Sequence, residues 1–422
     1  MKNVFYRFNI YSLIFIFLFL HVLVIPFPMY DKVFDEAYYT QAGNDLLDGI
    51  ASNAEHPFLG KLWGSIGISI FGDNWLGWRI HSVIFGALTV FVFYHFANLF
   101  IDKRKSLYAS TLLVFENIFF IHSSLYLLEV PALFFSLAAL YCYFKKKYFI
   151  MSFMFALALL SKETSIFFLT SLIFYHTCIN IKKIFNKKIN FKFITFIPVV
   201  KKFVICLIIL SLFTGIPMWI YDILYKPNNI ENPVQHLKYM LDYQSGLSNI
   251  DKDFYPYEYA WNWVLPLYPE EMIYYDISIS KNVTSYTDDG IVSSKITTIH
   301  PIHWSGIGNI PLWLIGFWCT ISGAMYFIIK RIDIKFNSMI LIMIFGTYLP
   351  YIFISYMGRI VYPFYFITSV PFIILGISNI INYKKTEKYY IISFIFLLIV
   401  LSWFIVFFPL KFLDFPEYLS YP

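Results

Sequence analysis

The chain has 422 residues, of which 59% are hydrophobic, 22% are aromatic and only 14% are charged, and its formal net charge is +6. A water-soluble domain carries roughly 25% charged residues, so this chain lacks the polar side chains needed to cover a globular surface. Its Lys and Arg residues lie in short clusters between apolar segments, which argues against nucleic acid as a partner and indicates a lipid bilayer.

Apolar segments long enough to cross the ~30 Å hydrocarbon layer as helices recur along nearly the whole sequence. They predict an all-α polytopic membrane protein with about eleven transmembrane helices in a single domain, 1–422. Two segments between these helices, 29–75 and 222–308, are too long to be simple connections. The helices are expected at 8–28, 76–101, 106–122, 125–144, 148–161, 164–181, 203–221, 309–329, 338–356, 360–381 and 389–409.

The distribution of Lys and Arg predicts the orientation of these helices. The turns on one side hold 21 of the 32 basic residues, although the opposite side contains far more loop sequence. By the positive-inside rule, the basic side faces the cytoplasm. We therefore expect the N-terminus inside, and the C-terminus and both long segments outside, in an integral membrane protein.

The first external segment brings several ionisable side chains to the membrane surface. Residues 36–50 are a candidate amphipathic helix, and residues 58–71 interleave apolar residues with Gly and Ser, as expected of a helix in the membrane interface. In one interpretation Asp35 only caps the first of these helices, which is a common role for Asp. In the other, a polar site is formed by Asp35, Glu36, Glu55, His56 and Lys61.

A second group of ionisable residues lies within or beside the predicted helices, in their outer halves. A charge near the bilayer centre costs about 2.5–3.5 kcal/mol on insertion scales, so such residues usually pair or line a polar cavity. Each of them alone also fits a side chain that extends to the interface. Together with the acidic external segment they predict one polar pocket at the extracytoplasmic boundary. The residues are Arg79, Glu116, Glu129, Lys162 and Arg359.

Two motifs in the external segment carry a family resemblance. Phe34-Asp35-Glu36, followed by His56-Pro57-x-Leu59-Gly60-Lys61, resembles the first external loop of the protein O-mannosyltransferases, which are GT-C membrane glycosyltransferases. The chain differs from that family in Glu116 and Glu129, where the family has Asp, and in Ser124, where it has Arg. Weaker matches are Gly77-Trp78-Arg79, Phe115-Glu116-Asn117, Leu127-Leu128-Glu129, Ser161-Lys162, Gly308-Asn309-x-Pro311 and Arg359.

The resemblance implies transfer of a hexose, usually mannose, from a polyprenyl (dolichyl) phosphate donor to a Ser or Thr hydroxyl, with inversion, at the extracytoplasmic membrane face. Asp35 is then the candidate base, and Glu36 would orient the acceptor or the sugar. The donor phosphate would be bound by Lys162, Arg359 and Arg79. The supporting residues would be Glu116, Asn117, Glu129, His56 and Lys61. The acceptor side would be lined by Trp261, Trp263 and His303.

Several alternatives remain open. The acceptor could be a glycolipid or a glycan instead of a protein. A lipid transporter is an alternative from another class, and it would need ionisable residues on both sides of the bilayer midplane. A non-catalytic partner subunit is a third, favoured by Ser124, Glu116 and Glu129. No metal ion is required by this scheme, the lipid-phosphate sugar is the expected donor, and the sequence does not predict the oligomeric state.

Overall fold

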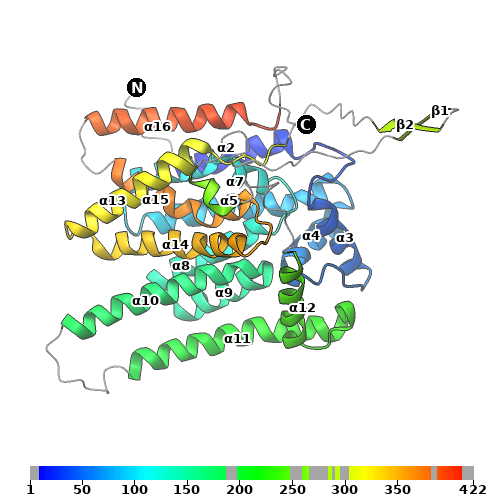
Figure 1. Cartoon of the computed structure of the whole chain (residues 1–422), viewed down its shortest axis with the longest axis horizontal. Coiled ribbons are helices and arrows are strands. Elements are labelled where there is room, and N and C mark those ends of the chain that lie inside the picture. The colour runs from blue at the N-terminus through cyan, green and yellow to red at the C-terminus, as the bar shows by residue number, and fades with distance from the viewer. Residues whose placement is uncertain are drawn as a thin grey trace.

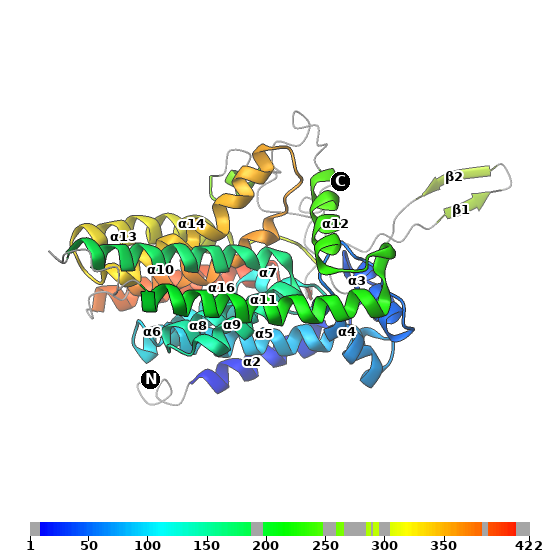
Figure 2. The same ribbon diagram turned by 90° about the horizontal axis from the view of Figure 1, so that it is seen from below.

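The computed structural model describes residues 9–186, 197–247, 259–265, 284–287, 290–294, 304–381 and 387–410. Most of its helices run side by side along the long axis of the molecule (Figures 1 and 2). They are α2 (Ile10–Val24), α5 (Trp75–Ala97), α6 (Lys103–Val114), α7 (Asn117–His122), α8 (Glu129–Phe144), α9 (Tyr148–Ser161), α10 (Ile166–Asn186), α11 (Ile197–Tyr225), α13 (Phe317–Ile329), α14 (Ile334–Tyr356), α15 (Val370–Ile381) and α16 (Glu387–Val406).

The helical membrane fold predicted from the sequence is confirmed. Among the described residues, five helices are long and apolar enough to cross a bilayer, and shorter apolar helices accompany them. Two expected spans are interrupted. The span 106–122 breaks into α6 and α7 at Glu116, whose side chain accepts a hydrogen bond from the backbone N–H of Phe119 at 2.6 Å and caps α7. The span 360–381 consists of the 3-10 turn η8 (Pro363–Thr368) followed by α15.

Three further helices lie at one end of the bundle, on the right of Figure 1. Helix α4 (Phe58–Phe71) has the expected bounds, whereas α3 (Glu36–Leu47) ends before the expected residue 50, where Gly49 has a positive φ of 76°. Helix α12 (Pro233–Gly246) stands across the end of α11 (Figure 2). Helix α3 begins directly after Asp35, and α4 begins directly after His56-Pro57.

The long segment 222–308 is not a single loop. Helix α11 continues through Tyr225, and it is followed by the 3-10 turn η3 (Pro227–Asn229), α12 and the 3-10 turn η5 (Ala260–Trp263). The strands β1 (Thr284–Thr287) and β2 (Gly290–Ser294) form an antiparallel hairpin in which Thr284 pairs with Ser294. This small hairpin departs from the all-helical expectation and lies apart from the bundle (Figure 1).

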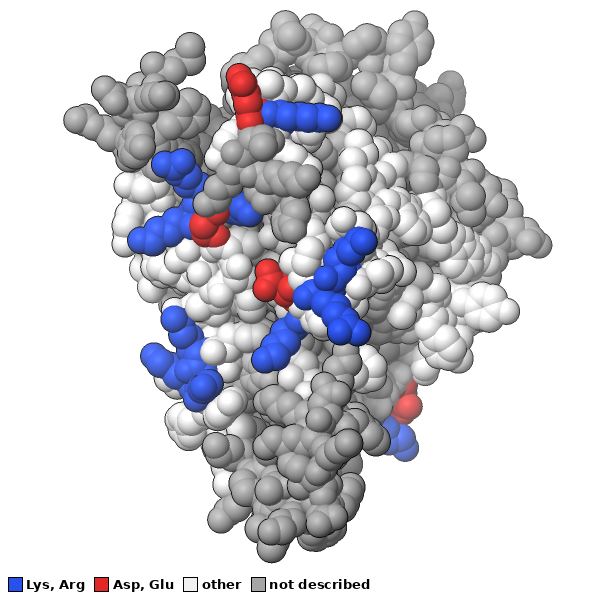
Figure 3. Space-filling view, turned by 90° about the vertical axis from the view of Figure 1, so that its left-hand side faces the viewer, with Lys and Arg blue, Asp and Glu red and all other residues white. Residues whose placement is uncertain are grey.

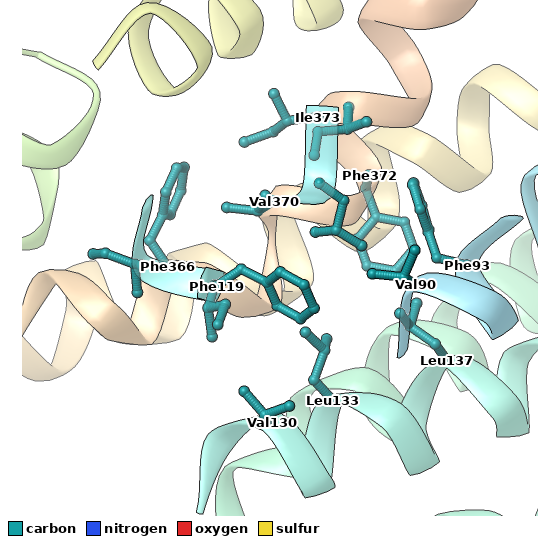
Figure 4. Close-up of a cluster of buried hydrophobic side chains, with 14 of the residues drawn as sticks. Val90, Phe93, Phe119, Val130, Leu133, Leu137, Phe366, Val370, Phe372 and Ile373 are labelled. Atoms are coloured by element: carbon teal, nitrogen blue, oxygen red, sulfur yellow. The ribbon is translucent and has the colours of Figure 1, made fainter. Parts of the chain in front are cut away.

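The centre of the bundle is apolar. Figure 4 shows side chains of α5, α7, α8, η8 and α15 converging, among them Phe93, Phe119, Leu133 and Phe372, all of which are buried. Close packing of this kind stabilises helix association in lipid, where helices have no water to exclude. The cluster fixes the ends of α7, α8 and η8 relative to one another, and these ends carry the polar residues described below.

Two glycines set the position of α4 against that framework. A Cβ on Gly60 would lie 2.6 Å from the backbone oxygen of Ser161, and a Cβ on Gly64 would lie 1.9 Å from the Tyr126 ring. Neither position can therefore carry a larger side chain without moving the helix. The Tyr126 hydroxyl also donates to the backbone oxygen of Lys61. Helix α4 thus packs closely against the end of α9, directly before Lys162.

Candidate active site

The polar residues gather where α3, the start of α8, the turn after α9 and η8 meet. At the centre is a buried ion pair between Lys162 and Glu129, whose side chains are 4% and 7% exposed. The second oxygen of Glu129 accepts from Nδ1 of His122 at 3.3 Å. Nζ of Lys162 also lies 5.4 Å from the ring centre of Phe364 and 5.5 Å from that of Tyr365. The ammonium group is therefore held between a carboxylate and two aromatic faces.

The charge of Lys162 is maintained by this arrangement. Burial opposes the ammonium charge, but the carboxylate of Glu129, with smaller contributions from Tyr365 and Glu163, raises the pKa of Lys162 above its ordinary value. Lys162 is consequently a permanent cation at physiological pH. A preorganised cation in a partly dry site is suited to binding an anion or stabilising a developing negative charge.

Asp35 lies beside this pair and differs from the carboxylates around it. Its side chain does not cap α3, so the capping interpretation is not supported, and in the described part of the chain no hydrogen bond to its carboxylate is found. Burial, followed by the nearby charge of Glu129, raises the pKa of Asp35 from 3.8 to about 6, and Lys162 and His56 oppose the shift. An unpaired, partly desolvated carboxylate has the properties of a general base.

The backbone immediately before Asp35 is strained. Phe34 has a φ of 55°, in the left-handed region that bulky residues rarely adopt. Its ring packs edge-on against Tyr362 and Phe364, with ring centres 6.1 Å apart in each case. Strain of this kind costs about 1–3 kcal/mol and concentrates at functional sites. Here the strained residue directly precedes Asp35, and its ring packs on Phe364, which adjoins Lys162.

A second pair of ionisable side chains, His56 and Glu163, also lies near Asp35. Nδ1 of His56 is 3.1 Å and 3.2 Å from the two carboxylate oxygens of Glu163, the residue that follows Lys162. Burial opposes the Glu163 charge, but His56 and then Lys162 lower the pKa of Glu163 to about 2. The His56 ring also packs edge-on against Tyr39, one turn after Asp35 on α3, with ring centres 6.0 Å apart.

Arg359 approaches from the loop after α14. Its guanidinium donates to the side chain of Gln244 on α12, while its Nε is buried and has no hydrogen-bond partner. The hydroxyl of Tyr365 is within electrostatic range of both Arg359 and Lys162, so the two cations flank this residue. A small cavity adjoins Tyr365, and its polar lining residues are Glu129, Thr164, Ser165, Tyr351, Tyr365 and Thr368.

The structure does not support phosphate binding by Arg79. Its guanidinium is fully buried and donates to both carboxylate oxygens of Glu36 at 2.7 Å, and its remaining N–H groups point to backbone oxygens of residues 25–31. Glu36 in turn accepts from the backbone N–H groups of Val33 and Tyr126. Both side chains are saturated, so their geometry is that of a structural ion pair and not of substrate-binding groups.

Three expected supporting residues also have structural partners. Lys61 is buried and donates to the backbone oxygens of Ser52, Asn53 and His56, so it holds the loop before α4. The carboxylate of Glu116 accepts from the backbone N–H of Asn309 at 3.3 Å and from the Trp313 indole at 3.0 Å, so it joins α7 to the segment before α13. Asn117 accepts from the Asn309 amide at 3.1 Å.

The structure describes two of the three residues expected on the acceptor side. Trp263 is 1% exposed and packs against Tyr348, Tyr351 and Phe366, which makes it a core residue and corrects its assignment to a binding surface. Trp261 is half-buried and stacks on Tyr259 with ring centres 4.0 Å apart. His303 lies outside the described residues.

Sequence reasoning overlooked Glu163, His122 and Tyr365. Glu163 directly follows the expected cation Lys162, and a second charge at the same helix end was a usable signal. His122 and Tyr365 gave none, because a buried His or Tyr in an apolar segment looks like a core residue. Among the described residues no group of three or more His, Cys, Asp or Glu side chains is placed to hold a metal ion.

The fold is that of the GT-C membrane glycosyltransferases. The chain superimposes on the Saccharomyces cerevisiae protein O-mannosyltransferase complex Pmt1–Pmt2 bound to the sugar donor, with a TM-score of 0.61, 12% identity, and coverage of 95% of this chain and 89% of that chain. It also resembles ArnT of Cupriavidus metallidurans bound to undecaprenyl phosphate, with a TM-score of 0.60, 11% identity, and coverage of 93% and 62%.

Within this class, the resemblance to protein O-mannosyltransferases is confirmed. Residues 55–214 match the model of the dolichyl-phosphate-mannose–protein mannosyltransferase family. The polyprenol-phosphate-mannose–protein mannosyltransferase of Mycolicibacterium smegmatis is 31% identical over 120 residues, which are 26% of this chain and 23% of that protein. The sequence match thus spans less than a quarter of the length of this relative, while the structural match extends over nearly the whole chain.

Proposed function

We propose that this chain is a membrane glycosyltransferase that transfers a hexose, expected to be mannose, from a polyprenyl-phosphate donor to an acceptor hydroxyl. The observation that carries the proposal is the position of Asp35, whose unpaired carboxylate lies within electrostatic range of the buried Lys162–Glu129 pair. A base and a fixed cation side by side are the two groups that such a transfer requires. The family match over residues 55–214 supports the choice of donor.

In the proposed reaction the acceptor oxygen attacks the anomeric carbon of the sugar as Asp35 takes the hydroxyl proton. The bond between that carbon and the phosphate oxygen breaks, and its electron pair remains on the lipid phosphate. Attack from the face opposite the phosphate inverts the anomeric configuration. Lys162 and Arg359, which flank Tyr365, would stabilise the negative charge on the departing phosphate. No step requires a metal ion.

The bundle also has the asymmetry expected of a protein with an external active site. Figure 3 views the end of the bundle on the left of Figure 1, where basic side chains predominate over acidic ones. The turns at that end include Lys103–Lys105, Lys145–Lys147 and Lys330–Arg331. Asp35 lies at the opposite end with α3 and α4. By the positive-inside rule the basic end is cytoplasmic and the site opens on the extracytoplasmic face.

The test is transfer by the purified protein in lipid nanodiscs, with polyprenyl-phosphate mannose as donor and a Ser/Thr-rich peptide as acceptor. Wild-type protein should form glycosylated peptide with inverted configuration, and Asp35→Asn should reduce the rate by about 10²–10⁴-fold. Asp48→Asn is the matched control, because Asp48 is exposed at the far end of α3. Unimpaired transfer by Asp35→Asn would remove Asp35 as the base, and no transfer by wild-type protein to any acceptor would overturn the function.

The acceptor is the finer part of the proposal. A Ser or Thr hydroxyl of a protein is expected because the family match names protein mannosyltransferases. A parallel reaction with glycolipid and glycan acceptors decides between them: exclusive labelling of the lipid or glycan would retain the chemistry and reject the protein acceptor. The GT-C fold argues against a transporter.

A further inference from the structure

The main chain of the loop before α4, residues 52–56, accepts several hydrogen bonds from buried side chains. The backbone oxygens of Ser52, Asn53 and His56 accept from the buried ammonium of Lys61. The backbone oxygen of Ala54 accepts from Nε2 of His236 on α12 at 2.9 Å. Four carbonyls within five residues are thus bound by side chains from two different helices. Two buried polar side chains are used to hold this short loop, which indicates that a side chain in the loop needs a fixed position.

The anchor from α12 is itself a buried ion pair. Nδ1 of His236 lies 2.6 Å from the carboxylate of Asp222 near the end of α11, and both side chains are fully buried. Nε2 of His236 contacts the backbone oxygen of Ala54 and Nδ1 contacts the Asp222 carboxylate, so the ring bridges the two. Helices α11 and α12 and the loop 52–56 are joined at this point.

The side chain that these anchors position is His56. Its Nδ1 faces the carboxylate of Glu163, so Nδ1 carries the hydrogen and the lone pair of the neutral ring is on Nε2. Among the described residues no hydrogen bond to Nε2 of His56 is found. The His56 side chain is 16% exposed, so part of the ring is accessible to solvent. This is the arrangement of a proton acceptor whose tautomer is fixed by a carboxylate.

We infer that His56, oriented by Glu163, removes the proton that Asp35 acquires in each transfer and passes it to solvent. The inference rests on the proposed function. The proton moves from the Asp35 carboxyl group to Nε2 of His56, which regenerates the carboxylate, and then from the imidazolium to water; no electrons change hands. His56 acts through Asp35 and is therefore a positioning and relay residue. Asp35 interacts electrostatically with His56, and the ring of Tyr39 on α3 packs against the His56 ring.

The surroundings of His56 define what a pH experiment will detect. Glu163 contacts the His56 ring from the turn after α9, and Tyr39 contacts it from α3. Asp35, at the start of α3, is within electrostatic range of the ring. Lys61 donates a hydrogen bond to the backbone oxygen of His56. Glu55 is the adjacent residue, and its carboxylate accepts from the Asn53 amide at 2.7 Å. Glu55→Gln therefore removes a neighbouring charge without altering the His56–Glu163 contact, which makes it the matched control.

The test compares His56→Ala, His56→Gln and Glu163→Gln with Glu55→Gln in the nanodisc transfer reaction. The two His56 variants and Glu163→Gln should lower kcat by about 10-fold or more with KM for the donor unchanged, and Glu55→Gln should match wild type. Added imidazole should restore His56→Ala in proportion to its concentration, which a purely structural role would not produce. The pH–rate profile of His56→Gln should differ from that of wild type, whereas the profile of Glu55→Gln should match it.

The possible results distinguish a failure of the His56 proton relay from a failure of the proposed transferase function. If wild type is active, Asp35→Asn is inactive, and His56→Gln turns over at the wild-type rate with the wild-type pH profile, the relay is wrong and the transferase remains. Loss of activity in His56→Ala without rescue by imidazole, together with normal activity of Glu163→Gln, would also overturn the relay. Should His56→Ala fail to fold, Glu163→Gln decides, because it removes the negative charge that stabilises the His56 imidazolium and leaves the main-chain anchors of the loop intact.

Discussion

Arg79 donates to both oxygens of the Glu36 carboxylate at 2.7 Å, whereas the carboxylate of the preceding residue, Asp35, receives no hydrogen bond within the described part of the chain. Two acids that are adjacent in sequence thus have opposite environments. Glu36 is satisfied by Arg79 and by the backbone N–H groups of Val33 and Tyr126. Its partners fix the start of α3 and leave Asp35 as the carboxylate that can react.

Asp35 should destabilise the folded protein. Burial raises its pKa from 3.8 to about 6, so the ionised form is less favourable in the folded than in the unfolded chain at neutral pH. Asp35→Asn removes this cost and should raise the free energy of unfolding at pH 7.5 by up to about 3 kcal/mol. Thermal unfolding in detergent is the measurement, with Asp48→Asn as the control. A lower Tm for Asp35→Asn would contradict the assignment.

The same pKa shift predicts the acidic limb of the pH–rate profile. The base must be ionised to accept the hydroxyl proton, so the transfer rate should fall as pH decreases through about 6, about two units above the limb of an ordinary Asp. Asp35→Glu, if it retains partial activity, should move this limb without changing donor affinity. Rates measured from pH 4.5 to 8.5 at saturating donor test this, and a flat profile down to pH 4.5 would exclude Asp35.

Arg79→Lys should act on stability and not on donor affinity. Lysine cannot donate bidentately to Glu36 and satisfy the surrounding backbone oxygens as well. Each buried acceptor left without a hydrogen bond costs about 1–3 kcal/mol, so the folded fraction and the Tm should fall. The remaining folded protein should bind the donor with wild-type affinity. Weaker donor binding with an unchanged Tm would restore Arg79 as a phosphate ligand.

A double variant of Lys162 and Glu129 should distinguish the contribution of Lys162 to stability from its contribution to donor binding. Lys162→Met alone leaves the buried Glu129 carboxylate without its cation and should lower stability by about 3–5 kcal/mol. Combining it with Glu129→Gln removes both charges and should recover most of that loss. Donor affinity, measured with labelled polyprenyl phosphate, should remain low in the double variant. Recovery of affinity together with stability would show that Lys162 does not contact the phosphate.

Arg359→Ala should weaken donor binding with little loss of stability, since the guanidinium is half-buried and its Nε is unpaired. Gln244→Ala is the matched control, because it removes the side chain that Arg359 bonds to and leaves the charge in place. Donor affinity should fall at least 10-fold in Arg359→Ala and about twofold or less in Gln244→Ala, which corresponds to 1.4 kcal/mol or more for the charge. Equal affinities would place the phosphate elsewhere.

The sequence predicted the elements better than the pairings. Apolar length located the helices, and the bounds of α4 followed from the pattern of Phe58–Phe71. The break at Glu116 was not predicted, because a capping acid and a membrane-embedded acid look alike in sequence. A buried cation is equally ambiguous: Lys162 and Arg79 both lie at helix ends, and only the approach of Glu36 shows that Arg79 is fully occupied. These distinctions depend on contacts between distant segments.

The anchoring of the loop 52–56 through its carbonyls has a consequence for acceptor choice. Since main-chain oxygens hold this loop, its path does not depend on the side chains it carries. A point change at Ser52 can therefore alter what the loop presents to an incoming molecule while His56 stays in place. New preferences can evolve, or be engineered, on this backbone without any insertion or deletion.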